Sequence, residues 1–242
     1  PVANRTVGGA TGAKPRFEAY HASLSLCSHK VRTVLAEKAQ PYISHALNIM
    51  PSGKFIPHTY RPEYVRLRLR AAPQKALVSG YSGASAVTVE GVDPLVVPTL
   101  IDHEAGRIVI DSRAICEHVA QSVDTGTDLM PADLSADLDR MTELVDRMPH
   151  VALLYGAHPD GDHRPKGLIS GIQGVHAKKN RAVKDVLAHL SPDSDLRPAY
   201  EAKIAKETAA ASFVIDDASM RAAHEATRVG KPYFFRAVQM RS

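Results

Sequence analysis

The chain has 242 residues, 44% of them hydrophobic, which is enough for one large domain or two ordinary ones with a buried core. Its 30 basic and 26 acidic side chains give a formal net charge of +4, and the basic residues are scattered. This pattern does not indicate a nucleic-acid partner, and no apolar run approaches the roughly 20 residues that span a bilayer. Two cysteines, Cys27 and Cys116, are too few for a disulfide framework, which favours a reducing, cytoplasmic location.

The first part of the chain predicts the element order β-α-β-α-β-β-α. Residues 1–15 lack a hydrophobic stretch like a signal sequence and are expected to form a flexible tail. Alternating and helical spacings of apolar residues predict strands at 17–21, 42–49, 95–102 and 107–110, and helices at 26–39, 63–72 and 111–121. The order implies a parallel strand pair joined by a right-handed crossover, followed by a hairpin.

Loops and helices account for the rest. Residues 73–93 are rich in Gly, Ser and Ala and predict an inserted loop, and the turn-rich segment 123–134 is the expected linker. Helices are expected from the N-cap Ser135 to Pro149, at 169–190, and at 200–228, with Pro192 and Pro198 bracketing a loop.

The most informative segment is Ser25–Arg32, where a hydroxyl and a thiol stand two residues apart as a strand gives way to a helix. Cys27 therefore falls in the first helical turn, where backbone N–H groups and the helix dipole stabilise a thiolate. Lys30 and Arg32 add positive charge. The local sequence leaves two alternatives open: Cys27 as a buried structural residue, and Ser25 as a plain N-cap.

Two further segments place notable residues at the ends of elements. Pro98 interrupts an apolar strand pattern, so it is expected to end a strand at a turn or to follow a cis peptide bond. Asp111 and Ser112 precede a helix. Such a pair is most often a cap, but the helix start also offers N–H groups to an anion.

In this order and spacing, the three motifs resemble those of the glutathione transferase superfamily. Three segments carry the likeness: an active-site motif similar to that of the zeta class (Ser25-x-Cys27-Ser28-x-Lys30-Val31-Arg32), a cis-proline turn (Val97-Pro98-Thr99-Leu100) and a γ-glutamyl-binding turn (Asp111-Ser112-x-Ala114-Ile115). The resemblance implies an α/β thioredoxin-like glutathione-binding domain at 16–122, followed by an all-α substrate domain at 135–242.

Further segments resemble the reductive dehalogenases of chlorinated hydroquinones within that superfamily. Enzymes acting on dichlorinated hydroquinones are the nearer match, and those acting on tetrachlorinated ones are more distant. The likeness covers roughly residues 16–223 and includes the segments 62–70, 93–100, 127–129, 149–156 and 209–215. Residues 229–242 do not resemble the family's continuation, so the usual last helices are expected to be missing or diverged.

The resemblance implies that glutathione is a co-substrate and that no metal takes part. Ser25 would donate a hydrogen bond to the glutathione sulfur, and the backbone of Val97, before Pro98, would pair with the cysteinyl part. Asp111 and Ser112 would hold the ammonium and carboxylate of the γ-glutamyl end. The implied partners are glutathione, a small aromatic substrate and a second copy of the chain in a homodimer.

The role of Cys27 distinguishes the possible reactions from one another. The resemblance implies that its thiolate takes the glutathionyl group from a conjugate of the hydroquinone, and that a second glutathione resolves the mixed disulfide. A zeta-type cis–trans isomerase of a maleylacetoacetate-like compound is the alternative enzyme. A non-catalytic glutathione-binding protein is the alternative from another class.

The remaining candidates are weaker. His150, Tyr155 and Arg164 lie in a family-like segment and are candidates to line the hydroquinone pocket, although a helix end packed under a loop is an equal alternative. Cys116 is expected in the core, and the run 158–163 predicts a surface loop, not a metal site. His29 stands beside the site with no assigned role.

Overall fold

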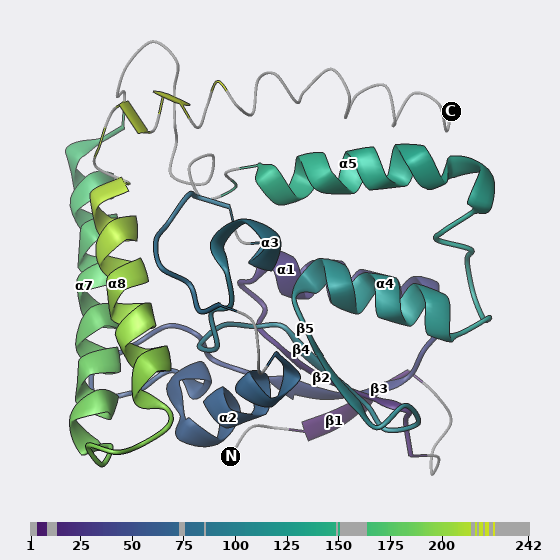
Figure 1. The fold of residues 1–242 in the computed structure, drawn as a ribbon, viewed down its shortest axis with the longest axis horizontal. Helices are drawn as coiled ribbons and strands as arrows, with labels where there is room; N and C mark the ends of the chain where they lie inside the picture. Colours follow the sequence, from purple (N-terminus) through teal and green to yellow (C-terminus); the bar gives the residue numbers. More distant parts are fainter. Residues whose placement is uncertain are drawn as a thin grey trace. The chain divides into compact units, whose positions relative to one another are not determined.

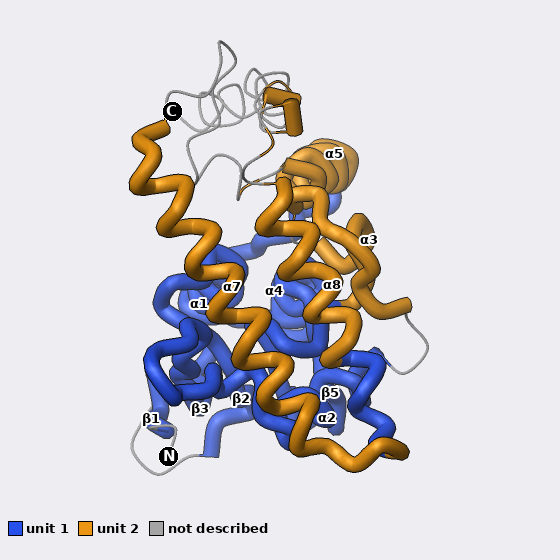
Figure 2. Tube along the Cα trace, turned by 90° about the vertical axis from the view of Figure 1, so that its left-hand side faces the viewer, with its two compact units in different colours: residues 1–75, 93–134, 194–199 blue, residues 76–92, 135–193, 200–242 orange. Residues whose placement is uncertain are grey.

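The computed structural model describes residues 4–8, 14–72, 76–84, 86–148, 150, 164–213, 216, 218–219, 221–222 and 225. Two compact units divide the chain (Figure 2). The first holds residues 1–75, 93–134 and 194–199, and the second holds residues 76–92, 135–193 and 200–242.

A mixed sheet with the order β1-β3-β2-β4-β5 lies at the centre of the first unit (Figure 1). Its strands are β1 Asn4–Val7, β2 Phe17–His21, β3 Tyr42–Ala46, β4 Thr99–Asp102 and β5 Arg107–Ile110. β2 and β3 are parallel, whereas β1 with β3, β2 with β4, and β4 with β5 are antiparallel. The predicted parallel pair and the predicted hairpin are therefore confirmed.

Helices cover both faces of this sheet (Figure 1). α1 Leu26–Glu37 and α4 Ser112–Ser122 lie side by side on one face, and α2 Pro62–Ala71, after the short η1 His58–Tyr60, lies on the other. The larger core forms under α1 and α4 from Phe17, Ala19, Val31, Leu35, Tyr42, Leu100, Val109, Ile115 and Val119. A smaller cluster of Ala22, Leu47, Tyr64 and Val97 includes a side chain of α2. Successive side chains of β2 point to opposite faces of the sheet, which explains why the buried residues form two separate clusters.

Several expected elements have other bounds in the structure: the strand expected at 42–49 ends at Ala46, α5 begins at Ser135 itself, and the helix expected at 200–228 ends at Phe213. Four further differences change the fold more. Residues 4–7, expected within a flexible tail, form β1, because their backbone groups pair with β3. The strand expected at 95–102 begins only at Thr99, since Val97–Pro98 is a cis peptide in a turn. The expected loop at 73–93 contains α3 Val87–Glu90, and α8 begins at Arg197, with Pro198 in its first turn, where proline is tolerated.

The second unit is built from helices. They are α3, α5 Ser135–Arg147, α7 Lys166–His189 and, from Tyr200 onward, most of α8 Arg197–Phe213, while η2 Ala132–Leu134 precedes α5. Within the described residues, no helix is long and apolar enough to cross a membrane, and no group of three or more His, Cys, Asp or Glu side chains could hold a metal ion.

A buried ionic cluster joins α7 to α8. The carboxylate of Glu207 lies 2.8 Å from Nδ1 of His176 and 2.8 Å from the ammonium of Lys203, and Lys179 lies 3.9 Å away. Burial by itself raises the pKa of Glu207, but these cationic neighbours outweigh it and hold that pKa well below its ordinary value. Glu207 is therefore ionised at neutral pH and ties the two helices together.

Asp102 ties the sheet to the chain segments around it. Its fully buried carboxylate accepts hydrogen bonds from Nε and Nη2 of Arg16, from Nε2 of His118, and from the backbone N–H groups of Glu104 and Ala105. Burial raises the pKa of Asp102, but these hydrogen bonds, led by Arg16, bring it far below its ordinary value. A single ionised side chain thus fixes the segment before β2, the hairpin turn and α4.

We predict that Asp102→Asn lowers the free energy of unfolding by about 3 kcal/mol at neutral pH, because it leaves Arg16 without its buried partner. Since the folded-state pKa of Asp102 is depressed, its contribution is complete above the unfolded pKa of about 4 and is lost as the pH falls further. Urea unfolding should therefore show the two proteins converging in stability as the pH falls below about 4. A stability difference that stays constant across this range would contradict the prediction.

Candidate functional site

The loop between β2 and α1 is closed by a small set of hydrogen bonds. Ser25 is the N-cap of α1, and its hydroxyl oxygen accepts the N–H of Ser28 at 3.2 Å. The fully buried Ser28 hydroxyl accepts the N–H of Ala22 at 3.1 Å, and the carbonyl of Ala22 accepts the N–H of Ser25. Cys27 is thereby fixed at the second residue of the helix, with its side chain partly exposed.

The start of α1 is a favourable place for a thiolate. The N–H groups of the first turn have no acceptor within the helix, and the positive end of the dipole lies here. Lys30 is three residues further on, on the same side of α1 as Cys27. The predicted position of Cys27 in the first helical turn is confirmed.

The second cysteine has a different environment. Cys116 packs against the larger core, and burial raises the pKa of its thiol to about 12, although nearby Lys30 acts against this rise. Neither cysteine takes part in a disulfide. The core position predicted for Cys116 is confirmed, which leaves Cys27 as the candidate nucleophile.

Two leucines beside Cys27 were not among the predicted site residues. Leu24 and Leu26 are 77% and 56% exposed, an unusual environment for large apolar side chains. The sequence offered one signal: these leucines flank the polar N-cap Ser25, at a position where the start of a helix normally has polar residues. They give the surface next to the thiol an apolar character.

The peptide bond between Val97 and Pro98 is cis, as the resemblance predicts. α2 holds this turn from one side. Tyr64 donates its hydroxyl hydrogen to the carbonyl of Val96 at 2.8 Å, and the buried Arg68 donates to the carbonyls of Pro98 and Asp93. Arg68 also donates to the hydroxyl of Thr99. The sequence predicted α2 as a basic helix but not that one of its arginines is buried.

The backbone of Val97 differs from that of its two neighbours in its hydrogen bonding. Its neighbours' carbonyls, at Val96 and Pro98, both bond to α2. The N–H and carbonyl of Val97 form no hydrogen bond with any residue that the structure describes. Buried backbone groups are almost always paired, so this unpaired position suits a ligand that supplies a peptide-like partner.

Asp111 caps α4 from an unusual backbone conformation. With φ at 75°, it directs its carboxylate oxygen to the N–H groups of Arg113 and Ala114, at 2.9 and 3.3 Å. Ser112 is the first residue of the helix and is buried. The predicted cap is confirmed, and the roles of both residues toward glutathione stay predictions.

The strand register brings these three motifs to one edge of the sheet. Tyr20 of β2 pairs with Thr99 of β4, and Thr99 pairs with Ile110 of β5. The end of β2, the start of β4 and the end of β5 therefore coincide, and both α1 and α4 begin there (Figure 1). Val97 also packs with Ala22, just before Ser25.

The remaining candidate residues lie outside this sheet edge or form structural hydrogen bonds. His29 donates from Nε2 to the carbonyl of Ser23 at 2.7 Å, so it braces the loop that carries the site. His150 and the buried Arg164 belong to the second unit, where His150 donates to the carbonyl of Val145. Tyr155 lies outside the described residues. Their part in a substrate pocket stays a prediction.

The fold of the first unit is thioredoxin-like: a parallel strand pair and a hairpin form its sheet, and a cis-proline turn and two helix starts lie at one edge of that sheet. Residues 24–122 match the family described as the N-terminal domain of glutathione S-transferase. The predicted fold class is confirmed.

The relatives are more specific. Over 212 residues the chain is 49% identical to the 2,5-dichlorohydroquinone reductive dechlorinases of two strains of Sphingobium indicum, an alignment that covers 87% of this chain and 60% of theirs. The chain thus spans three fifths of the length of these curated relatives. A glutathione transferase from Phanerochaete chrysosporium, solved with oxidized glutathione, is 17% identical, with a TM-score of 0.40 over 94% of this chain and 96% of that one.

We predict that Arg68→Met lowers the free energy of unfolding by about 3 kcal/mol, because the buried carbonyls of Pro98 and Asp93 lose their donor. Arg66 on the same helix is the matched control: it is 56% exposed, and its nearest acidic group, Asp195, is 3.9 Å away. Arg66→Met should change stability by less than about 0.5 kcal/mol. Equal effects of the two substitutions in urea unfolding would argue against the role of Arg68.

The two cysteines should also differ in reactivity. With a pKa of about 12, only about one Cys116 thiol in ten thousand is ionised at a pH of about 8. Iodoacetamide should therefore modify the folded protein at Cys27 and modify Cys116 only after denaturation. Peptide mass spectrometry reads out both sites, and alkylation of Cys116 at the rate of Cys27 in the folded protein would contradict this assignment.

Proposed function

We propose that this protein is a glutathione-dependent reductive dehalogenase of chlorinated hydroquinones. Its 49%-identical relatives are named 2,5-dichlorohydroquinone reductive dechlorinases. The observation that carries the proposal is the partly exposed thiol of Cys27, two residues after the N-cap Ser25, at the edge where the cis-proline turn and the start of α4 also lie. Because the chain spans three fifths of those relatives, both the reaction and the substrate are part of the proposal.

Glutathione would bind along this edge as an extended peptide. The unpaired N–H and carbonyl of Val97 would bond to its cysteinyl residue, as an added strand does. The N–H groups and the hydroxyl of Ser112 at the start of α4 would hold the γ-glutamyl carboxylate, and Asp111 would pair with the ammonium group. Ser25 uses its oxygen to cap α1, so its hydroxyl hydrogen remains able to donate to the glutathione sulfur.

The proposed cycle has three sulfur steps. Glutathione thiolate attacks the chlorine-bearing carbon of the keto tautomer of the hydroquinone, a carbon–sulfur bond forms, and chloride leaves. The Cys27 thiolate attacks the sulfur of this conjugate, the carbon–sulfur bond breaks, and the ring carbon takes a proton. A second glutathione thiolate attacks the mixed disulfide and regenerates Cys27. One chlorine is replaced by hydrogen as two glutathione molecules become one disulfide.

An apolar surface beside the thiol supports an aromatic substrate. Leu24 and Leu26 would contact the ring as it approaches Cys27. His150, Tyr155 and Arg164 remain proposed residues for binding the aromatic substrate. We also propose a homodimer in the cytoplasm, where glutathione keeps thiols reduced.

We predict that the protein releases chloride and glutathione disulfide in equal amounts from 2,5-dichlorohydroquinone and glutathione. Cys27→Ser should stop disulfide formation and accumulate the glutathionyl-hydroquinone conjugate, because a serine hydroxyl cannot attack the conjugate sulfur. Cys116→Ala is the matched control and should keep the full cycle. Ion chromatography and mass spectrometry measure the products.

Two outcomes would overturn the proposal. Isomerisation of a maleylacetoacetate-like compound without chloride release or glutathione oxidation would indicate the zeta-type isomerase. Binding to immobilised glutathione without turnover of either substrate would indicate a glutathione-binding protein. Normal turnover by Cys27→Ser would contradict the role of this thiol even if dechlorination occurs.

A further inference from the structure

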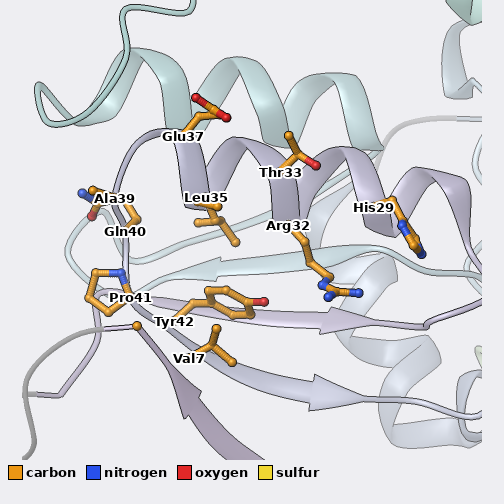
Figure 3. A pocket seen from close by; sticks show the side chains of 12 residues that line it. Val7, His29, Arg32, Thr33, Leu35, Glu37, Ala39, Gln40, Pro41 and Tyr42 are labelled. Atoms are coloured by element: carbon orange, nitrogen blue, oxygen red, sulfur yellow. The ribbon is translucent and has the colours of Figure 1, made fainter.

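A cavity lies in the first unit beside α1, between this helix and the strands β1 and β3 (Figure 3). Its volume is about 600 Å³, within the range of small-molecule sites. Its walls come from the end of β1, from α1 and from the start of β3, and its lining residues are Val7, Gly8, His29, Arg32, Thr33, Leu35, Ala36, Glu37, Ala39, Gln40, Pro41 and Tyr42.

The cavity is apolar at one end and cationic at the other. Val7, Leu35, Ala36 and Pro41, with the ring of Tyr42, supply the apolar wall. The guanidinium of Arg32 points down from α1 toward the sheet and toward the hydroxyl end of Tyr42 (Figure 3). The carboxylate of Glu37 points away from the sheet and is held by the hydroxyl of Thr127. The one acidic side chain in the lining is therefore turned away from Arg32.

One further arginine and a histidine lie on the same face of the sheet. The register of β1 with β3 places Arg5 opposite Ser44 and Val7 opposite Tyr42, so both β1 residues face the side of α1. His21 of β2 lies there too, with its ring 6.4 Å from that of Tyr42 and its Nε2 bonded to the Ser44 hydroxyl.

His21 lies in a buried and cationic environment. Burial is the largest cause that lowers its pKa, and together with Arg32, Arg5, His45 and His29 it brings this pKa to about 4. Its Nδ1 is buried and has no hydrogen-bond partner among the residues that the structure describes. Arg32 is half-buried, yet its side chain forms neither an ion pair nor a hydrogen bond with any residue that the structure describes. A guanidinium with no acidic partner among the described residues is available to form charge-assisted hydrogen bonds with a bound anion.

We propose that this cavity is a binding site for an organic carboxylate with a compact apolar body, which pairs its carboxylate with Arg32 and packs its body against Val7, Ala36 and Tyr42. The site is separate from the thiol. Arg32 is five residues after Cys27, which places the two about 140° apart around the axis of α1. The proposal therefore stands whether or not the dehalogenase reaction is confirmed.

The test uses 1-naphthoate, with its uncharged amide as the comparison probe, titrated into the full chain by isothermal calorimetry. Wild-type protein should bind naphthoate, and Arg32→Gln should weaken it about tenfold to a hundredfold with little change for the amide. Ala36→Leu, at an exposed position of α1, should narrow the cavity and weaken both probes. Arg107→Gln, an exposed arginine of β5, is the matched control and should leave both affinities unchanged.

Thermal unfolding of each variant shows that it is folded. A naphthoate titration in saturating glutathione tests whether the cavity is distinct from the proposed glutathione site. Naphthoate should bind equally well with and without glutathione. The proposal is overturned if naphthoate does not bind, if Arg32→Gln or Ala36→Leu binds as tightly as wild type, or if glutathione displaces the probe.

Discussion

One buried cation determines the shape of the candidate site. Arg68 is almost completely inaccessible to water, and its cost of burial is offset by hydrogen bonds to two carbonyls and the hydroxyl of Thr99. These acceptors lie on both sides of Val97, so the arginine fixes the turn while leaving the Val97 backbone unpaired. Tyr64, one helical turn earlier, bonds to the carbonyl of Val96 and completes the support.

A fixed turn matters because the other two motifs rely on backbone geometry as well. Ser25 and Asp111 each cap a helix with a side-chain oxygen. Capping uses acceptor oxygens and leaves other first-turn N–H groups available, so helix stability and the proposed anion binding would not compete for the same atoms. The candidate site is thus assembled from parts that the fold needs in any case, and the proposed chemistry depends on one thiol.

Local patterns were sufficient to predict most of the first unit. The alternation in 17–21, the helical spacing after Cys27 and the proline within an apolar strand depend on neighbouring residues, and each was confirmed. The burial of Arg68 could not be predicted, because its acceptors are distant in the sequence and a basic helix is normally solvated. β1 was missed for the same reason: four residues form a strand only because the edge of β3 is there to pair with them.

The pairing of β1 with β3 has a practical consequence for work with shortened forms of this protein. Without residues 4–7, β3 would become the edge of the sheet and would present its backbone donors and acceptors to any other chain. Such an edge recruits further strands, so a trimmed domain would associate with itself at high concentration. An expression boundary chosen from domain matches that start at residue 24 would remove both β1 and β2.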